Sequence, residues 1–396
     1  MKTIIIGAGV SGIVSALSIK NNDEIIILEH NDKPLKKLLL TGNGKCNYFN
    51  DEWNENKYFS YDKELIKDFI NEENKNKIIN FYDSIGLIPR IKNGYYYPSS
   101  NQAYTVYNSL LKELSLRSIV IKYNYDVNNI KYENNKYIIN NDLVCDKLII
   151  STGSKAYPKT GSNGFGYKFC SDFNIKINNV YPSLVSLIVD NNLKDISGAR
   201  SDVKVSLYES NNLITSEIGE IQFGDNNISG ICIYNLSIYM NKNNYKVKVN
   251  FLNDFNINKD NFNDRFNELN NKLNNRNITD LLECFLNYKI VNYILKISKV
   301  DGNKKYNEIS LKEKENLMNH LLELSFDIID TKGYDYSQVC SGGVSLKEIN
   351  TKTLESLKYK NLYFTGEVLD ITGVCGGYNL SFAVLTGLLL GEHIND

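Results

Sequence analysis

The first 28 residues combine two uninterrupted apolar runs with one helical pattern. Residues 4–6 and 25–28 consist only of Ile and Leu, and the segment between them repeats apolar positions at helical spacing. Uninterrupted apolar runs are typical of strands buried on both faces, and a helix between two such strands is typical of a parallel βαβ unit. We therefore expect strand 3–6, helix 12–21 and strand 24–28, in a parallel sheet covered by helices.

Less regular patterns follow as far as Pro182. Apolar spacing predicts helices at 63–83 and 102–115, and residues 33–50 form a polar, Gly-rich loop that is too long to be a simple connection. Further extended segments are expected at 95–98, 118–123, 129–132, 136–140 and 145–150. A turn at 133–136 pairs two of these as a hairpin.

The pattern changes after Pro182. Short segments of alternating polarity predict antiparallel strands at 183–189, 203–208, 213–223 and 245–252. A run of helices is expected over 259–322, interrupted near 274–277 and 301–306, and strand 326–329 follows it. Strand 363–366 and the apolar helix 379–393 complete the chain.

These patterns predict an α/β fold in which both ends of the chain form one nucleotide-binding domain. A mixed β and helical insertion interrupts that domain. We expect the domain to comprise residues 1–182 and 334–396, the inserted β part residues 183–255 and 323–333, and the helical part residues 256–322.

Glycines directly after the first strand indicate a dinucleotide site. Gly7 allows a tight turn, Gly9 allows close approach of a diphosphate, and Gly12 allows the helix to pack near its strand. The free N–H groups at the start of that helix favour phosphate. Glu29 follows Gly7 by 22 residues, where a carboxylate accepts hydrogen bonds from a ribose.

A second glycine cluster, Gly366 to Asn379, favours FAD over NAD. An NAD domain has no need of this segment, whereas a flavin uses both a carboxylate at a strand end, here Glu367, for its ribityl hydroxyls and a helix N-terminus for the negative charge of its reduced ring. Gly376 and Gly377 open such a helix. Ser151-Thr152-Gly153 ends another buried strand, where flavoproteins of this type place a chain crossing near the adenosine.

Composition narrows the possible classes of protein further. The net charge of −1 gives no reason to expect nucleic acid or an anionic membrane as partner, and no run is long enough to span a membrane. The seven cysteines are scattered without a CxxC pair, and the three histidines have no metal-ligand spacing. We therefore expect a cytoplasmic protein with no metal site and a small-molecule substrate.

The sequence resembles the BaiN/YhiN-like NAD(P)/FAD-dependent oxidoreductases, also described as aminoacetone oxidase-type FAD-binding flavoproteins. The most specific matching segments are Leu40-Thr41-Gly42-Asn43-Gly44-Lys45-Cys46-Asn47 and Gly376-Gly377-Tyr378-Asn379. The resemblance implies bound FAD, a Rossmann-like domain of the two-dinucleotide-fold type, an inserted antiparallel β-barrel with a helical domain, and Val127 as a backbone contact to adenine. The sequence departs from the family pattern at Lys45, where Arg is common, at Ser154 and Ser381, and in the loop 224–227. Because that loop is expected on the substrate side, these departures put the substrate in doubt more than FAD binding.

Motifs and resemblance together give one set of expected cofactor-binding residues. They are Gly7, Ala8, Gly9, Val10, Ser11, Gly12, Glu29, His30, Lys37, Thr41, Gly42, Asn43, Gly44, Lys45, Cys46, Asn47, Val127, Thr152, Gly153, Gly366, Glu367, Asp370, Gly376, Gly377, Tyr378, Asn379 and Leu380. We interpret Cys46 as a packing thiol and not a redox partner, because no second cysteine lies near it in sequence. The sequence identifies no catalytic residue.

We expect an FAD-dependent oxidoreductase that transfers hydride between flavin N5 and a small organic substrate. One possible reaction is reduction of an activated C=C bond, with NAD(P)H as a transient donor. The alternatives are oxidation of a small amine or aminoketone by oxygen, a structural or regulatory FAD without turnover, and an NAD-only dehydrogenase. The sequence fixes neither the substrate nor the oligomeric state.

Overall fold

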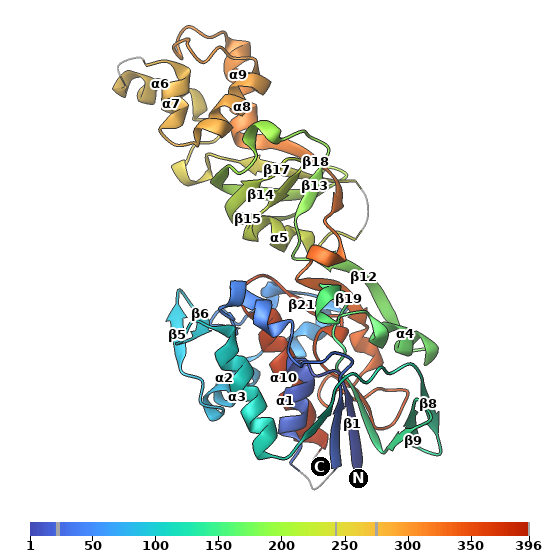
Figure 1. The fold of residues 1–396 in the computed structure, drawn as a ribbon. Helices are drawn as coiled ribbons and strands as arrows, with labels where there is room; N and C mark the ends of the chain where they lie inside the picture. The colour runs from blue at the N-terminus through green and yellow to red at the C-terminus, as the bar shows by residue number, and fades with distance from the viewer. Residues whose placement is uncertain (21–23, 242–243, 274–275, 395–396) are drawn as a thin grey trace. The chain divides into compact units, whose positions relative to one another are not determined.

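The computed structural model describes residues 1–20, 24–241, 244–273 and 276–394 (Figure 1). Two compact units are present, and the first combines both ends of the chain. It consists of Met1–Ser183 and Ser337–Asp396, and the second consists of Leu184–Tyr336. Each unit has its own hydrophobic core.

A five-stranded parallel sheet forms the centre of the first unit, in the order β20-β11-β1-β2-β7. The strands are β1 (Lys2–Ile6), β2 (Glu24–Leu28), β7 (Val120–Lys122), β11 (Lys147–Ile150) and β20 (Leu362–Phe364). Ile4 is in register with Leu148 on one side and Ile26 on the other. The Ile and Leu runs are buried because helices cover such sheets on both faces. This confirms the predicted α/β fold of Rossmann type.

Two helices from opposite ends of the chain pack closely beside this sheet. They are α1 (Val10–Ser18) and α10 (Tyr378–Ile394). A Cβ added to Gly387 would lie 2.8 Å from Val14, and one added to Gly391 would lie 2.1 Å from Ser18. The two glycines therefore set the helix separation, and larger side chains would push the helices apart.

Smaller elements surround the parallel sheet in the first unit. The helices are α2 (Glu72–Ser84), α3 (Ala103–Leu116) and α4 (Phe165–Asp172). The strand groups, all antiparallel, are β3 (Phe49–Asn50) with β6 (Tyr95–Pro98) and β5 (Pro89–Lys92); β8 (Ile130–Glu133) with β9 (Lys136–Ile139) and β10 (Leu143–Cys145); β12 (Ile177–Ser183) with β19 (Val339–Val344); and β4 (Tyr58–Phe59) with β21 (Thr372–Gly373).

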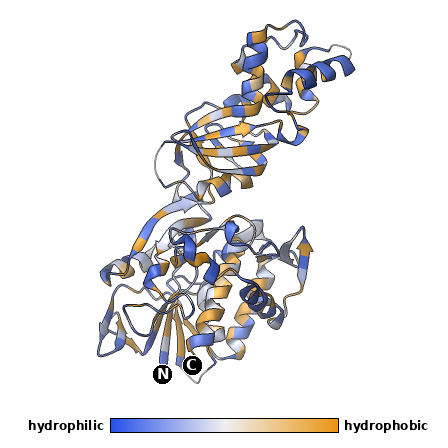
Figure 2. Cartoon of the chain, turned by 180° about the vertical axis from the view of Figure 1, so that it is seen from behind, coloured by the Kyte–Doolittle hydropathy of each residue, from blue (hydrophilic) through white to orange (hydrophobic). Residues whose placement is uncertain are grey.

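The second unit contains a closed antiparallel barrel, in the order β13-β16-β15-β14-β17-β18. Its strands are β13 (Leu187–Val189), β14 (Arg200–Glu209), β15 (Asn212–Phe223), β16 (Asn227–Ser229), β17 (Tyr245–Asn250) and β18 (Leu324–Thr331). Residues alternate between buried and partly buried along β17, and Figure 2 shows the barrel strands banded by hydropathy. Phe223, Phe251 and Phe326 fill the interior. The predicted inserted barrel is confirmed.

Five helices accompany the barrel and share its core. They are α5 (Ile231–Ser237), α6 (Phe262–Lys272), α7 (Ile278–Glu283), α8 (Tyr288–Ser298) and α9 (Leu311–Glu323). Phe262 and Phe266 stack with ring centroids 4.1 Å apart inside the helical part. Ser310 and Glu313 form a capping box at the start of α9, which fixes where that helix begins.

Several elements differ from the sequence-based expectation. The helix expected over 63–83 is divided into a 3₁₀ segment, Lys63–Asp68, and α2, because the side chain of Asn71 caps the N–H of Asn74. The strand expected over 145–150 is two strands that separate at Asp146. Elements β5, β12, β16, β19 and α5 were not predicted. Residue 21 of the expected helix 12–21 and residues 274–275 of the expected interruption lie outside the described residues.

A helix must be both long and apolar to span a bilayer. Among the residues described, no helix is both long enough and apolar enough to cross a membrane.

Candidate cofactor site

The turn after β1 is compact on one side and open on the other. Gly7 has φ +105°, and a Cβ there would lie 2.5 Å from the Ser151 carbonyl oxygen. A Cβ on Gly12 would lie 2.1 Å from the Gly7 oxygen, whereas one on Gly9 would meet nothing within 4 Å. Helix α1 has no side-chain cap at Gly9. The N–H groups of its first turn thus have no side-chain cap, and the space beside Gly9 is open, as diphosphate binding requires.

Glu29 is buried at the end of β2 with both carboxylate oxygens bonded. Oε2 accepts a hydrogen bond from the backbone N–H of Ala8 at 2.9 Å. Oε1 accepts from the backbone N–H of Asn31 at 2.9 Å and from its side-chain amide at 2.8 Å. His30 is exposed beside it, with Nδ1 3.8 Å from Oε1. These bonds fix the carboxylate next to the turn that carries Ala8.

The loop after β2 is strongly bent and exposes most of its predicted residues. Within the 3₁₀ segment η1 (Leu38–Gly44), Gly42 and Asn43 have left-handed backbone angles. Gly44 and Lys45 are exposed, but Cys46 is fully buried, and burial raises the pKa of its thiol to about 12. The Asn47 Oδ1 atom is buried and has no hydrogen-bond partner. Cys46 is therefore placed to pack, and Asn47 retains an unused acceptor.

The second glycine cluster begins directly after β20. Gly366 has φ +75°, and a Cβ there would lie 2.4 Å from the Ser11 hydroxyl. Glu367 Oε2 lies 2.7 Å from Lys37 Nζ and 3.2 Å from the Ser154 hydroxyl. A Cβ on Gly377 would lie 3.0 Å from Asn47 Oδ1. The structure thus places the two glycine clusters and the loop after β2 next to one another.

The end of this cluster forms a closed loop before α10. The Asn379 side chain accepts from the Gly373 N–H at 2.8 Å and donates to the Gly373 oxygen at 2.7 Å. Gly376 and Gly377 both have positive φ. Tyr378 is buried, and Leu380 is partly buried. The Asn379 amide therefore shapes the loop, and the first backbone groups of α10 follow the two glycines.

Asp370 lies beneath this loop with no exposed surface. Its Oδ2 accepts from the Ser60 hydroxyl at 3.2 Å, the Tyr61 N–H at 2.9 Å and the Asn178 amide at 2.8 Å. Oδ1 is buried and has no hydrogen-bond partner. Burial raises the pKa of Asp370 to about 7. Its side chain connects the loop to β12 and to the segment after β4, and it offers no surface to a ligand.

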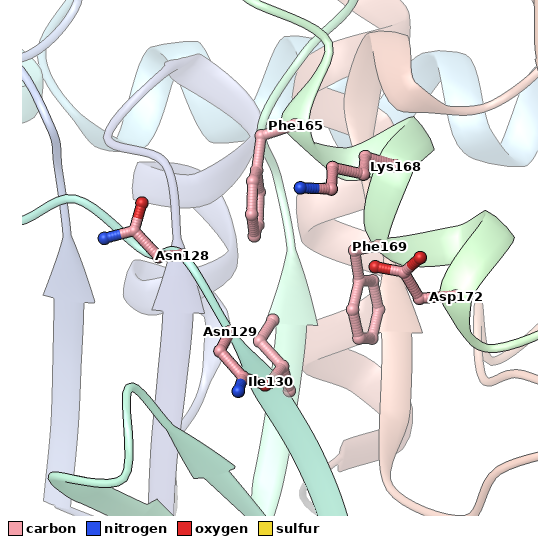
Figure 3. Close-up of a pocket in the computed structure, with 7 residues that line it drawn as sticks. All are labelled: Asn128, Asn129, Ile130, Phe165, Lys168, Phe169 and Asp172. Atoms are coloured by element: carbon pink, nitrogen blue, oxygen red, sulfur yellow. The ribbon is translucent and has the colours of Figure 1, made fainter.

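Thr152 and Gly153 follow β11 beside the first turn. The Thr152 hydroxyl is buried and has no hydrogen-bond partner, and Gly153 has φ +69°. Val127 is partly buried, and a pocket with a volume of about 180 Å³ begins at the next residue. Figure 3 shows this pocket between the segment before β8 and helix α4. It is lined by Asn128, Asn129, Ile130, Phe165, Lys168, Phe169 and Asp172.

Sequence reasoning did not identify the long-range partners of these residues. Ser154 on Glu367, Asn178 on Asp370 and Asn50 beside Gly376 come from distant segments. The run Tyr95-Tyr96-Tyr97 was a signal, because alternate residues of a strand share a face. Tyr95 and Tyr97 both lie beside predicted glycines, Gly376 and Gly42 respectively. Within the described ranges, His, Cys, Asp and Glu side chains form no group of three that could hold a metal.

The chain is similar to several known proteins. The chain is 32% identical over 402 residues to a 3-dehydro-bile acid delta(4,6)-reductase of Clostridium scindens, covering 98% of this chain and 97% of that one. It is 25% identical over 398 residues to a ribosomal RNA dihydrouridine synthase of Escherichia coli, covering 96% and 94%. A solved flavocytochrome c3 fumarate reductase aligns with all of this chain and 78% of its own, at 10% identity and a TM-score of 0.48.

The glycine turn, the parallel sheet and the inserted barrel define a flavin-dependent oxidoreductase with an FAD-binding Rossmann domain. The chain belongs to the family described as the HI0933-like protein Rossmann domain, whose model matches residues 1–393.

Proposed function

We propose that this protein reduces a C=C bond conjugated to a carbonyl group in a small organic substrate, with NAD(P)H as the transient electron donor. The observation that carries the proposal is the meeting of three segments: the two glycine clusters lie together at Ser11 and Gly366, and the loop after β2 joins the second cluster through Lys37 and Glu367. This arrangement brings together the segments that would bind the two ends of a long dinucleotide.

The residues at this surface fit FAD. Gly9 leaves room for a diphosphate, and Thr152 and Asn47 each hold a buried polar atom without a partner. Glu367 would accept hydrogen bonds from the ribityl hydroxyls, and the N–H groups after Gly376 would stabilise negative charge on the ring. Bound FAD would supply the N5 atom that accepts and donates hydride.

The relatives support this reaction type. One is named as a delta(4,6)-reductase of bile acids and the other as a dihydrouridine synthase. An unsaturated keto-steroid and a uracil ring both contain a C=C bond conjugated to a carbonyl. We therefore propose that this chain acts on the same chemical unit.

A small substrate is favoured over RNA by charge. Residues 184–336 contain 18 Lys and Arg against 21 Asp and Glu. Proteins that bind nucleic acid usually present a basic patch or stripe, because phosphate contacts dominate their affinity. The excess of acidic over basic residues in the insertion therefore favours a small molecule as substrate.

The test is an anaerobic half-reaction series on the FAD-loaded protein. We expect NADH or NADPH to bleach the visible flavin band and a 3-keto-Δ4 steroid to restore it. Bleaching by aminoacetone, with reoxidation by oxygen and not by the steroid, would instead identify an amine oxidase. Retention of the oxidised spectrum with every donor would indicate a structural flavin.

A further inference from the structure

The hairpin β5–β6 presents two chemically different faces. It forms one sheet with β3, in the order β3-β6-β5 (Figure 1). Arg90 pairs with Tyr97, Ile91 with Tyr96, and Lys92 with Tyr95. Directly paired residues in an antiparallel sheet point to the same side, so Tyr96 and Ile91 share one face and the other four residues share the opposite face.

The face with Tyr96 is partly covered by the protein itself, because Tyr96 packs against the core while Ile91 is 53% exposed. The Tyr96 ring packs edge-on against Phe49, with centroids 5.2 Å apart. Its hydroxyl donates to Asp51 Oδ1 at 2.8 Å. Tyr96 therefore has a structural role in the first unit.

The opposite face consists of Asn50, Arg90, Lys92, Tyr95 and Tyr97, and we call it the tyrosine face. It adjoins both glycine loops of the candidate cofactor site. The Asn50 amide donates to the Gly376 oxygen at 3.3 Å. Cε1 of Tyr95 lies 3.0 Å from the position of a Cβ on Gly376, and Cε1 of Tyr97 lies 3.8 Å from that on Gly42.

Two unpaired cations lie on the tyrosine face. Arg90 and Lys92 are exposed, and neither forms an ion pair with any of the residues described. Tyr95 is 37% exposed and Tyr97 partly exposed. Side chains directly opposite in such a pair have Cβ atoms about 5 Å apart. Each exposed cation is therefore paired across the hairpin with an at least partly exposed tyrosine on the same face.

We propose that the tyrosine face binds the substrate: Tyr95 and Tyr97 pack against its flat apolar skeleton, and Arg90 and Lys92 bind a carboxylate at its end. This inference rests on the proposed function, because Gly376 and Gly42 mark where the flavin ring would lie. Tyrosine rings provide large apolar area at little entropic cost, and arginine matches the geometry of a carboxylate.

The chemistry of the face favours a small carboxylic acid over RNA. Only two cations share the face, whereas RNA binding uses a longer series of phosphate contacts. Asp51, whose carboxylate accepts from Tyr96 on the reverse side, adds negative charge at the edge of the sheet. One carboxylate is matched by Arg90 and Lys92, whereas an extended polyanion is not.

The test compares 3-oxo-4-cholenoic acid with its methyl ester, on the FAD-loaded protein. The variant Arg90→Gln/Lys92→Gln should raise KM and the calorimetric Kd for the acid about tenfold or more, because a hydrogen bond to a charged group contributes about 1.5–3 kcal/mol. The ester should be unaffected, and so should kcat. Tyr95→Ala/Tyr97→Ala should weaken both ligands. The matched control is Lys131→Gln, an exposed cation on β8.

The possible outcomes separate the two proposals. Reduction of the steroid with equal effects on acid and ester would overturn the role of the tyrosine face and leave the proposed function intact. Acid binding that depends on Arg90 and Lys92, without any reduction, would support the face and overturn the proposed function. The face proposal also fails if the acid does not bind, or if the double variant loses binding only to a ribosomal RNA fragment.

Discussion

Lys37 and Glu367 form an ion pair with 2.7 Å between Nζ and Oε2, although 330 residues separate them in the chain. Both side chains are largely covered, and Glu367 also accepts from the Ser154 hydroxyl at 3.2 Å. The pair joins the loop after β2 to the turn after β20. It therefore holds the two halves of the candidate FAD site in one geometry.

Substitution of Glu367 should weaken FAD binding. In Glu367→Gln the charged acceptor is lost, so Kd should rise about tenfold or more, as hydrogen bonds to charged groups contribute about 1.5–3 kcal/mol. Fluorescence titration of the apoprotein with FAD measures this change. Lys77→Met, which breaks the ion pairs of Lys77 with Glu73 and Glu392, should leave Kd unchanged. Equal Kd values for wild type and Glu367→Gln would contradict a ribityl contact.

Substitution of Gly9 should lower FAD affinity, whereas substitution of Gly12 should lower stability. Gly9→Ala adds a Cβ into open space, so the melting temperature should hold while FAD affinity drops at least tenfold through blocked phosphate approach. Gly12→Ala places its Cβ 2.1 Å from the Gly7 oxygen, so the apoprotein itself should lose stability. Thermal melts with and without FAD separate the two effects. Unaltered FAD binding in Gly9→Ala would place the diphosphate elsewhere.

Asp370 should make stability depend on pH. Burial raises its pKa from 3.8 to about 7. The folded state therefore keeps a proton that the unfolded chain releases, and stability is lost as pH rises from about 4 to about 7. Relative to Asp370→Asn, the wild-type free energy of unfolding should drop by up to about 4 kcal/mol across this window. Urea melts at several pH values measure the difference.

In Asp370→Asn the amide oxygen can still accept hydrogen bonds from the three donors around Asp370, but the side chain no longer ionises. The comparison therefore measures the effect of ionisation. Asp83→Asn, an exposed carboxylate on α2, serves as the control and should parallel the wild type. A wild type and an Asp370→Asn variant whose stabilities stay parallel across the same window would show that the buried group does not titrate there.

Cys46 should be chemically inert. Its buried thiol has a pKa of about 12, so little thiolate is present near neutral pH. Cys284 is exposed and should react with iodoacetamide first. Mass spectrometry of partially labelled protein gives the order. Cys46→Ala should retain flavin reduction within about threefold, about 0.6 kcal/mol. Rapid labelling of Cys46 would instead indicate a redox thiol.

The sequence predicted the parts of the fold that depend on local pattern. The Ile runs of β1 and β2 and the spacing of Gly7, Gly9 and Gly12 determine the first βαβ unit without reference to distant residues. Barrel strands such as β17 were predicted from the alternation of polar and apolar residues. The expected positions of FAD contacts remain predictions, although the structure brings many of them together.

Long-range pairing explains what the sequence did not reveal. All four residues of β5 are exposed, so no apolar alternation marks it, and pairing with β6 makes it a strand. Strand β19 contains Gly342 and Gly343 with positive φ, which argues against a strand until its pairing with β12 is seen. The three hydrogen-bond donors around Asp370 come from two separate segments, residues 60–61 and β12.

The position of β20 has a consequence for biosynthesis. This edge strand pairs with β11, yet the ribosome makes it only after the whole 184–336 unit. Until residues 362–364 emerge, β11 presents unpaired N–H and C=O groups, and such open edges recruit other chains. Premature termination inside the insertion would therefore yield an aggregation-prone fragment without a completed cofactor pocket, instead of a partly active enzyme.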